Sequence, residues 1–415
     1  MSIIVQKFGG TSVADSTKIK NVAKAVTREY DKGHQVVVVV SAMGHTTDYL
    51  VSLAGEITSK PCSREMDMLL SSGEQVSIAL LAMAIQEAGY PAISLVAGQV
   101  GIITEKVHSK ARILDIKPDK MQGYLNEGKI VIVAGFQGVT PDNEITTLGR
   151  GGSDTSAVAL AATLKAERCD IYTDVDGVYS ADPRIIEKPS KLNQISYMEM
   201  LELARVGANV LHPRSVETAK QFNVPMRVRS SFNHDDLGTL IIGENLMEIY
   251  KPVSGVAADL SQVRLAILKV PDAPGTAAKV FTSLAEHNIS VDMIIQSLKE
   301  DNSNNIAFTV SESDLDQTLN ILERVKQEIN AADIVVDKNI AKVSIVGAGM
   351  IDKPGIAADM FSSLADASIN IKMISTSEIK ISCIVEKDRA HDAVKAIHTK
   401  FHLDEEGIEI PEISL

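Results

Sequence analysis

The chain has 415 residues, a length that predicts two to four domains, each able to bury a core of its own. Its 45% hydrophobic and 23% charged residues exclude a collagenous, a largely disordered or a membrane-spanning chain. The 41 Lys and Arg residues against 54 Asp and Glu give a formal net charge of −13, the wrong sign for a protein whose main partner is nucleic acid.

Up to about residue 242, short apolar runs alternate with longer helical stretches. Strands are predicted at 3–5, 36–40, 130–134 and 171–172, and helices at 16–30, 73–88, 154–164 and 197–204. This alternation predicts an α/β domain whose mostly parallel sheet has helices on both faces. Such sheets bind ligands beyond the carboxyl ends of their strands. Glycine-rich or polar segments begin at those ends, at Gly9, Ser41 and Gly135.

The second half of the chain contains an internal repeat. Residues 246–262 are predicted to be a linker, and beyond them residues 270–281 match residues 350–361 at an offset of 80. Each copy predicts the strand and helix order βαββαβ, the ferredoxin-like plan. The predicted domains are therefore residues 1–245, 263–340 and 341–415, with the linker between the first and the second.

Lys7 stands at the end of the first strand, before Gly9 and Gly10. A cation there can reach phosphate oxygens, while the glycines let backbone amides approach. The alternative is a lysine at a strand edge in water, because the spacing is not that of a Walker P-loop.

Two further segments are candidates for ligand binding. Residues 147–154 read Thr-Leu-Gly-Arg-Gly-Gly-Ser-Asp directly before a helix, where Arg150 can bind a carboxylate or a phosphate. Residues 173–184 combine carboxylates, Tyr179 and Arg184 after a strand, a set that could meet a ribose, Mg²⁺ and a base. Both segments also fit plain turns, since Gly, Asp and Ser are good turn formers and helix caps.

Other single residues allow weaker statements. Glu74 is predicted in the first turn of a helix, where an acid is favoured by the helix dipole whether or not it holds a substrate ammonium group. His398 and His402 have the spacing of a metal pair, but a solvated helix face is predicted for them, and His212 is predicted to close a turn. No side-chain metal site is predicted. Three widely spaced cysteines and the absence of an export signal predict a cytoplasmic protein without a membrane anchor.

The order of these segments resembles that of the aspartate kinases. The resemblance rests on Lys7-Phe8-Gly9-Gly10-Thr11-Ser12, Ser41-Ala42-Met43-Gly44, Gly73-Glu74, residues 148–154 and residues 173–179. It spans essentially the whole chain, because aspartate kinases of the monofunctional type also carry a C-terminal pair of ACT domains with the βαββαβ plan. The fold implied for residues 1–245 is the three-layer αβα sandwich of the amino acid kinase family.

The resemblance implies an activity. The γ-phosphoryl group of ATP would pass, with Mg²⁺, to the β-carboxylate of L-aspartate, giving 4-phospho-L-aspartate, the opening step toward lysine, threonine, methionine and isoleucine. A carboxylate is already a nucleophile, so catalysis would consist of positioning and charge neutralisation.

The resemblance also implies roles for single residues. Lys7, Arg150 and Asp154 would be catalytic; Lys7, Phe8, Gly9, Gly10, Thr173, Asp174, Tyr179, Asp182 and Arg184 would bind the nucleotide; and Thr47, Glu74, Arg150, Gly151, Gly152 and Ser153 would bind aspartate. Some relatives have a lysine near the nucleotide where this chain has Asn209, so no cationic contact to phosphate is expected from that position.

The ACT pair implies feedback control by lysine, threonine or both. By resemblance the effector would contact Asp272, Val291, Asp292, Gln296, Asn370 and Ile371, and paired ACT domains imply a homo-oligomer. Two alternatives are weighed against this reading: another amino acid kinase, and an amino-acid sensor without turnover. The ACT repeat and Glu74 disfavour the first, and the presence of Lys7, Glu74, Arg150 and Asp154 together disfavours the second.

Overall fold

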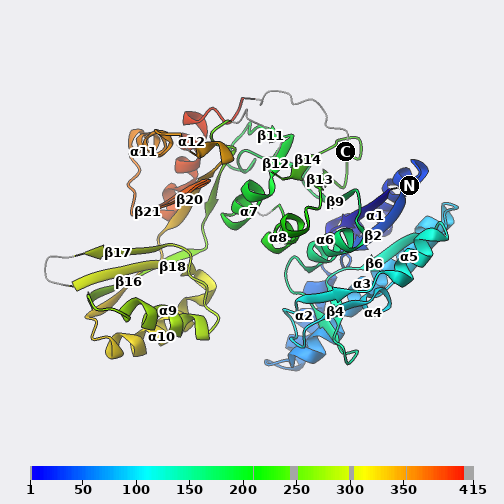
Figure 1. The fold of residues 1–415 in the computed structure, drawn as a ribbon, viewed down its shortest axis with the longest axis horizontal. Helices are drawn as coiled ribbons and strands as arrows, with labels where there is room; N and C mark the ends of the chain where they lie inside the picture. The colour runs from blue at the N-terminus through cyan, green and yellow to red at the C-terminus, as the bar shows by residue number, and fades with distance from the viewer. Residues whose placement is uncertain (1, 209, 244–250, 299–302, 352, 406–415) are drawn as a thin grey trace.

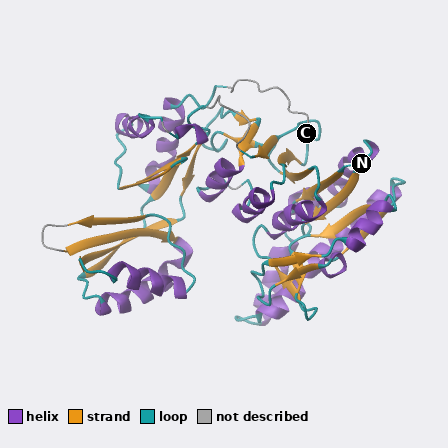
Figure 2. Ribbon diagram, viewed as in Figure 1, coloured by secondary structure: helices purple, strands orange, loops and turns teal. Residues whose placement is uncertain are grey.

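The computed structural model describes residues 2–208, 210–243, 251–298, 303–351 and 353–405. Residues up to 242 form an α/β domain around an eight-stranded sheet, and two smaller units with four-stranded sheets follow (Figures 1 and 2). The expected fold class is confirmed: a mostly parallel sheet within an α/β domain precedes two antiparallel ferredoxin-like sheets.

The large sheet has the strand order β12-β14-β13-β9-β1-β2-β6-β3, and of its neighbouring pairs only β13 with β14 is antiparallel. Its strands are β1 (Ile3–Phe8), β2 (Gln35–Val40), β3 (Ala92–Leu95), β6 (Ile130–Ala134), β9 (Arg168–Thr173), β12 (Gln194–Ser196), β13 (Met226–Ser230) and β14 (Thr239–Ile242). The central strands are runs of Val and Ile with almost no exposed residue, as expected for a sheet covered on both faces.

The register of the central strands places their carboxyl ends side by side. Phe8 is paired with Val40 on one side and with Tyr172 on the other, and Val40 is paired with Ala134. The residues that follow these strands therefore emerge at one edge of the sheet. The segments singled out in the sequence begin at this edge.

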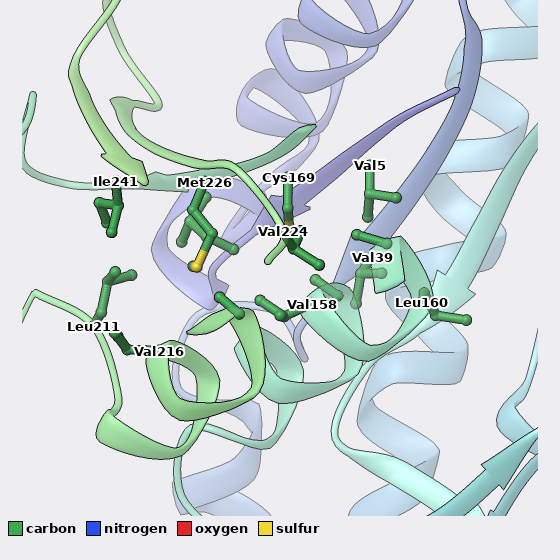
Figure 3. Close-up of a cluster of buried hydrophobic side chains, with 14 of the residues drawn as sticks. Val5, Val39, Val158, Leu160, Cys169, Leu211, Val216, Val224, Met226 and Ile241 are labelled. Carbon is green, nitrogen blue, oxygen red and sulfur yellow. The ribbon is translucent and has the colours of Figure 1, made fainter. Parts of the chain in front are cut away.

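Helices cover both faces of the large sheet. On one face lie α1 (Ser16–Asp31) and α3 (Ser63–Glu87), and on the other lie α5 (Asp119–Asn126), α6 (Gly152–Leu164), α7 (Tyr197–Arg205) and α8 (Pro213–Phe222). Figure 3 shows the second face, where Val158 of α6 and Val216 of α8 lie below Cys169 and Met226 of the sheet. The three layers follow from helices with one apolar stripe each, which must be buried against the sheet.

The helix α3 is long and apolar enough to span a membrane by length and composition. It packs against α1 and the sheet, however, and Ile78, Leu81 and Ile85 belong to the hydrophobic core. It is therefore a core helix of the α/β domain.

A small second sheet flanks the α/β domain, in the order β5-β4-β7-β8. The elements of this region are α2 (Thr46–Ile57), α4 (Ala97–Val100), β4 (Ile102–Thr104), β5 (Ile113–Ile116), β7 (Gln137–Val139) and β8 (Ile145–Thr147). Strand β8 ends where the glycine-rich segment before α6 begins. A separate two-stranded ribbon pairs β10 (Val178–Tyr179) with β11 (Lys191–Leu192).

The first repeat module spans residues 262–337. It contains β16 (Gln262–Pro271), α9 (Thr276–Glu286), β17 (Ile294–Leu298), β18 (Ser303–Ser311), α10 (Leu315–Glu328) and β19 (Asp333–Asp337). Its sheet has the order β17-β18-β16-β19 and is antiparallel throughout. The predicted βαββαβ plan is thus confirmed for this copy.

The second repeat module spans residues 341–403 and one strand from earlier in the chain. It contains β20 (Ala341–Val346), α11 (Ile356–Asp366), β21 (Met373–Ser377), β22 (Lys380–Val385) and α12 (Ala390–Lys400). Its sheet has the order β15-β20-β22-β21. The place held by β19 in the first module is taken here by β15 (Gly255–Asp259), which runs antiparallel to β20.

The predicted linker at 246–262 is therefore wrong in part. Residues 255–259 form an edge strand of the second module, so the first module is inserted into the sequence of the second. The sequence predicts that each copy supplies its own last strand. In the second copy, the counterpart of β19 would fall on residues 406–415, which lie outside the described residues.

The two modules contact each other through equivalent positions of the repeat. Met293 and Met373, 80 residues apart, lie in one buried cluster with Ile340 and Ile384. Ion pairs join Asp292 to Lys342, and Lys372 to Asp337 at 2.9 Å. The modules therefore pack through the sides on which the resemblance places the effector residues.

Candidate active site

Lys7 and Asp154 face each other at the carboxyl edge of the large sheet. Lys7 is the penultimate residue of β1, and Asp154 lies in the first turn of α6. The Lys7 Nζ lies 2.6 Å from the Asp154 Oδ1, and only 12% and 13% of the two side chains are exposed. The ion pair fixes a cation directly below the Gly9–Gly10 turn, since a Cβ on Gly9 would lie 3.6 Å from that Nζ.

The turns after β1, β2 and β6 press closely against one another. A Cβ on Gly10 would lie 2.8 Å from the Ala42 carbonyl oxygen, and a Cβ on Gly135 would lie 2.8 Å from the Ser153 Cβ. The Ser41 hydroxyl donates to the Ser153 Oγ at 3.0 Å. Three segments far apart in the sequence are thereby joined around the Lys7–Asp154 pair.

Glu74 lies beside the turn after β2, in the middle of α3. Its Oε1 accepts a hydrogen bond from the Ala42 backbone N–H at 3.1 Å, while its Oε2 is buried without a hydrogen-bond partner among the described residues. Burial raises the pKa of this carboxyl group to about 7. The prediction that Glu74 opens a helix is wrong, because α3 begins at Ser63, so the helix dipole does not account for this acid.

Thr47 is a half-buried residue in the first turn of α2. The methyl group of its neighbour Thr46 would lie 3.6 Å from a Cβ on Gly73, the residue before Glu74, so the start of α2 packs against this part of α3.

The glycine-rich segment passes from β8 into α6. Gly149 and Gly151 have φ angles of +78° and +68°, in the left-handed region that favours glycine, and Gly151 is the N-cap of α6. A Cβ on Gly151 would lie 2.2 Å from the His212 Cγ. Arg150 is exposed between these glycines, and Gly152 and Ser153 follow as the first residues of α6.

Four of the nine residues predicted to bind the nucleotide line one cavity. Asp174, Tyr179, Asp182 and Arg184 line a cavity of about 450 Å³. Asp182 and Arg184 form an ion pair at 2.6 Å, which holds the pKa of Asp182 below its ordinary value. Tyr179 donates its hydroxyl proton to the Asp176 Oδ1 at 2.9 Å.

Five members of the predicted nucleotide set, Lys7, Phe8, Gly9, Gly10 and Thr173, are not among the residues that line that cavity. Thr173, the last residue of β9, donates its hydroxyl proton to the Asp174 Oδ1 at 3.1 Å. The Phe8 side chain is fully buried on the α1 face and stacks on Tyr172 with ring centroids 4.4 Å apart. Phe8 could meet a nucleotide only through its backbone.

The predicted effector residues occupy the two repeat modules without forming one site in this chain. Asp272 accepts a hydrogen bond from Asn304 at 3.0 Å, Val291 packs on the core of the first module, and Asp292 pairs with Lys342. Gln296 is exposed on β17, and Asn370 and Ile371 precede β21.

Three single-residue predictions have mixed outcomes. His212 does cap a helix, accepting from the Arg214 N–H, but it also lies against the Gly151 turn, which no local pattern indicated. The prediction that His398 lies on a solvated helix face is wrong: the residue is 4% exposed, because α12 packs on the sheet of the second module. Asn209 lies outside the described residues.

Asp67 is a residue that sequence reasoning missed. It is fully buried, accepts the Thr147 hydroxyl at 2.6 Å and the Ser109 N–H at 3.0 Å, and so holds the start of the glycine-rich segment in place. An acid inside a helix gives no sequence signal for such a role, since its partners are 42 and 80 residues away.

Comparison with known proteins agrees with this geometry. Residues 2–230 match the amino acid kinase family, and residues 264–330 and 343–401 each match the ACT domain. The chain is 54% identical over 403 residues to aspartokinase 2 of Bacillus subtilis, covering 97% of this chain and 98% of that protein.

Two solved structures are similar over nearly the whole chain. One is E. coli aspartokinase III in complex with aspartate and ADP in the R-state, at 28% identity and a TM-score of 0.82, covering 96% of this chain and 99% of that one. The other is the same enzyme with lysine and aspartate in the T-state, at 28% identity and a TM-score of 0.74, with the same coverage. With its amino acid kinase domain and its two ACT domains, this chain belongs to the aspartokinases, the kinases of aspartate.

Proposed function

We propose that the carboxyl edge of the large sheet is where this aspartokinase transfers the γ-phosphoryl group of ATP to the β-carboxylate of L-aspartate, giving 4-phospho-L-aspartate. The observation that carries the proposal is the Lys7–Asp154 pair, which stands between the buried Glu74 region and the cavity around Tyr179. An acceptor on one side and a nucleotide on the other would meet at this pair.

The acceptor is assigned to the Glu74 side. The Glu74 carboxylate would bind the ammonium group of aspartate, with Thr47 beside it, and the exposed Arg150 would bind a carboxylate in bidentate fashion. Gly151, Gly152 and Ser153 open α6, whose N-terminus favours an anion, although the Gly152 N–H already donates to the Gly149 carbonyl oxygen at 3.0 Å.

The nucleotide is assigned to the other side. Asp174, Tyr179, Asp182 and Arg184 would face its base and ribose, Thr173 would lie beside them, and Gly9 and Gly10 would let backbone amides reach the phosphates. Mg²⁺ would neutralise phosphate charge. It usually takes one or two protein carboxylates and otherwise phosphate or water oxygens, and Asp154 offers a suitable carboxylate.

The chemistry needs no general base, since the attacking carboxylate is already ionised at neutral pH. The obstacle is repulsion between two anions, and the Lys7 ammonium group would stabilise charge on the transferring phosphoryl group. Asp154 holds the Lys7 side chain in position before substrate arrives.

The test is turnover of ATP with L-aspartate and Mg²⁺, with trapping of the acyl phosphate by hydroxylamine. Lys7→Ala should lower kcat on the order of a hundredfold, as loss of a preorganised transition-state contact does. Lys20→Ala, on an exposed position of α1, is the matched control and should leave kcat unchanged. Unchanged turnover in Lys7→Ala would remove Lys7 from the mechanism, and a substrate panel with L-glutamate and N-acetylated acids tests the acceptor.

Feedback control by lysine, threonine or both is proposed for the two ACT domains. The supporting observation is that the effector positions lie on the sides where the repeat modules pack, around Met293 and Met373. The same turnover assay with lysine, threonine and their mixture identifies the effector. Inhibition by none of them would overturn this part of the proposal.

We also propose a homo-oligomer and a cytoplasmic location. The strands β17 and β21 are sheet edges, and the repeat-equivalent Ile294 and Ile374 are exposed on them, as expected of strands that another copy can cover. Cys62, Cys169 and Cys383 are all free, which suits a reducing compartment.

A further inference from the structure

The cavity assigned to the nucleotide has a wall from the second repeat module. Asp174, Tyr179, Asp182 and Arg184 come from the α/β domain, while Val256, Ala257 and Ala258 of β15 and Val394 of α12 complete the lining. A regulatory module therefore forms part of the surface that a bound nucleotide would face. The segment that joins the two is residues 180–190, between β10 and β11.

Ser180, directly after Tyr179, connects this segment to three parts of the second module. It is 2% exposed. Its hydroxyl donates to the Leu403 carbonyl oxygen at 2.8 Å and lies 3.3 Å from the His398 Nε2. Its own carbonyl oxygen accepts the Val256 N–H of β15 at 2.8 Å.

The hydrogen bonds of the Ser180 hydroxyl fix its direction. A hydroxyl has one proton and two acceptor lone pairs. The proton goes to Leu403, and the Ser190 N–H donates to the Oγ at 3.0 Å, which leaves one lone pair for His398. His398 is buried, and burial lowers its pKa, so its neutral ring can supply an Nε2–H donor here. The hydroxyl is thus fully satisfied by fixed partners.

Apolar contacts also join residues 180–190 to the second module. Ala181 belongs to the hydrophobic core of the second module, together with Val256, Val394 and Leu403, and Ile185 packs against that core. Close approach of the two backbones requires glycine at residue 255, where a Cβ would lie 3.0 Å from the Ser180 carbonyl oxygen. The segment after Tyr179 is thus built into the second module as well as into the α/β domain.

We propose that Ser180 is a positioning residue for the nucleotide, holding the turn that carries Tyr179 and Asp182 against the second ACT domain through His398, Leu403 and Val256. The inference rests on the proposed nucleotide site, and it makes the second ACT domain a structural part of that site. Ser180 itself does not line the cavity, so its effect on the nucleotide is exerted through its neighbours.

The test compares Michaelis constants of the full-length enzyme. Ser180→Ala should raise the KM for ATP about 3- to 10-fold, the effect of losing one net hydrogen bond. The KM for aspartate and the kcat at saturating ATP should change less than about twofold, because the Glu74 side and Lys7 are not attached to this segment.

A matched control separates positioning from stability. Ser363→Ala removes a buried hydroxyl that donates to the Met360 carbonyl oxygen at 2.7 Å within α11 of the same module. It should lower the melting temperature like Ser180→Ala and leave the KM for ATP unchanged. An equal rise of the KM for ATP in both variants would show a general loss of stability and overturn the proposal.

His398 supplies a second, independent pair of variants. His398→Leu removes the donor to Ser180 and should raise the KM for ATP, whereas His398→Gln retains an N–H donor and should stay within about twofold of the wild type. The double variant Ser180→Ala with His398→Leu should add little to Ser180→Ala alone, since Ser180→Ala already removes the contact with His398. Additive effects would overturn the claim that Ser180 and His398 act through one contact. An unchanged KM for ATP in both Ser180→Ala and His398→Leu would overturn the positioning role of Ser180. A wild-type enzyme that does not bind ATP would instead overturn the proposed function.

Discussion

Among single residues, Glu74 shows most directly how burial and function conflict. Its carboxyl group is 3% exposed with one oxygen unpaired, so folding favours the protonated form, whereas binding an ammonium group requires the ionised form. Such a strained carboxyl group is typical of a binding site that the substrate completes. It has consequences for both stability and affinity as pH changes.

The stability of the wild type should fall, relative to Glu74→Gln, as pH rises from about 4.5 to about 7. The pKa of Glu74 is 4.5 in an ordinary environment and about 7 in the fold, so within this interval the folded state binds more protons than the unfolded state. The full change in the free energy of unfolding, relative to Glu74→Gln, is at most on the order of 3 kcal/mol. Melting temperatures of both proteins at pH 5 and pH 8 measure it; parallel curves would mean that the pKa is not raised.

The same titration should appear in substrate binding. The KM for aspartate of the wild type should fall as pH rises through about 7, because the Glu74 carboxylate forms over that range. Glu74→Gln should show a high KM for aspartate with no such transition. A wild-type KM that is flat across this pH range would separate Glu74 from the ammonium group.

Residues of the candidate site were predictable from sequence where a local pattern marks their position. Lys7 and Gly151 stand at strand ends and helix starts, which the alternation of apolar runs locates. His212 and Asp67 were not predictable in their roles, since their partners come from other elements through the register of the sheet and the packing of α3. Sequence patterns contain no information on such long-range contacts.

At the scale of elements, the glycine-rich segment before α6 depends on two conformational requirements. Gly151 adopts φ +68°, and the space where a Cβ would stand is filled by the His212 ring, 2.2 Å away. Any side chain there must displace either α6, which carries Ser153 and Asp154, or the start of α8. The segment thus couples substrate-binding backbone to the packing of two helices.

Gly151→Ala should therefore lower kcat/KM for aspartate at least tenfold, since a misplacement of about 1 Å can cost a hundredfold. It should also destabilise the fold by roughly 1 to 3 kcal/mol through the positive φ and the steric conflict. Gly123→Ala in α5 is the matched control, because a Cβ there meets nothing within 4 Å. That change should stabilise by up to about 1 kcal/mol and leave activity unchanged. Wild-type kinetics in Gly151→Ala would contradict the close approach of His212.

Element order was largely predictable, and topology was not. The four predicted strands of the α/β domain correspond to β1, β2, β6 and β9. The first three contain distinct runs of Val and Ile, and β9 was located by Ile171 and Tyr172 alone. The role of β15 could not be inferred: residues 255–259 are too short and too weakly patterned to show which of two equivalent modules they complete. Pairing of β15 with β20 depends on a free edge that exists only once the second module has folded.

For the whole molecule, the insertion of one repeat module into the other explains how catalysis and regulation are joined. The chain leaves the α/β domain, passes through β15 of the second module, builds the first module and then returns to complete the second. The second module is therefore held to the α/β domain at β15, at residues 180–190 and at α7.

Glu199 forms the contact at α7. Glu199 is 2% exposed. Its Oε2 accepts hydrogen bonds from the N–H and the hydroxyl of Ser196, the N-cap of α7. Its Oε1 accepts hydrogen bonds from the Ser254 hydroxyl and, at 2.9 Å, from the Ala348 N–H of the second module. Leu203 of the same helix lines the cavity assigned to the nucleotide. One carboxylate thus ties the second module to a helix beside that cavity.

Glu199→Ala should weaken inhibition by whichever of lysine or threonine inhibits the wild type. Loss of this bridge removes two charge-assisted hydrogen bonds between the second module and α7, so the inhibition midpoint should rise about 2- to 30-fold, the range expected for a residue that modulates coupling. Dose–response curves at fixed ATP measure the change.

Two control variants locate the effect of Glu199 in the bridge. Ser196→Ala removes the helix cap while leaving the Oε1 contacts to Ser254 and Ala348 in place, so it should cost about 1 kcal/mol of stability with an unchanged inhibition midpoint. Asp392→Ala breaks an exposed pair with Arg389 on α12 and should change neither quantity. If Glu199→Ala and Ser196→Ala shifted the midpoint equally, capping of α7 and not the bridge would carry the coupling.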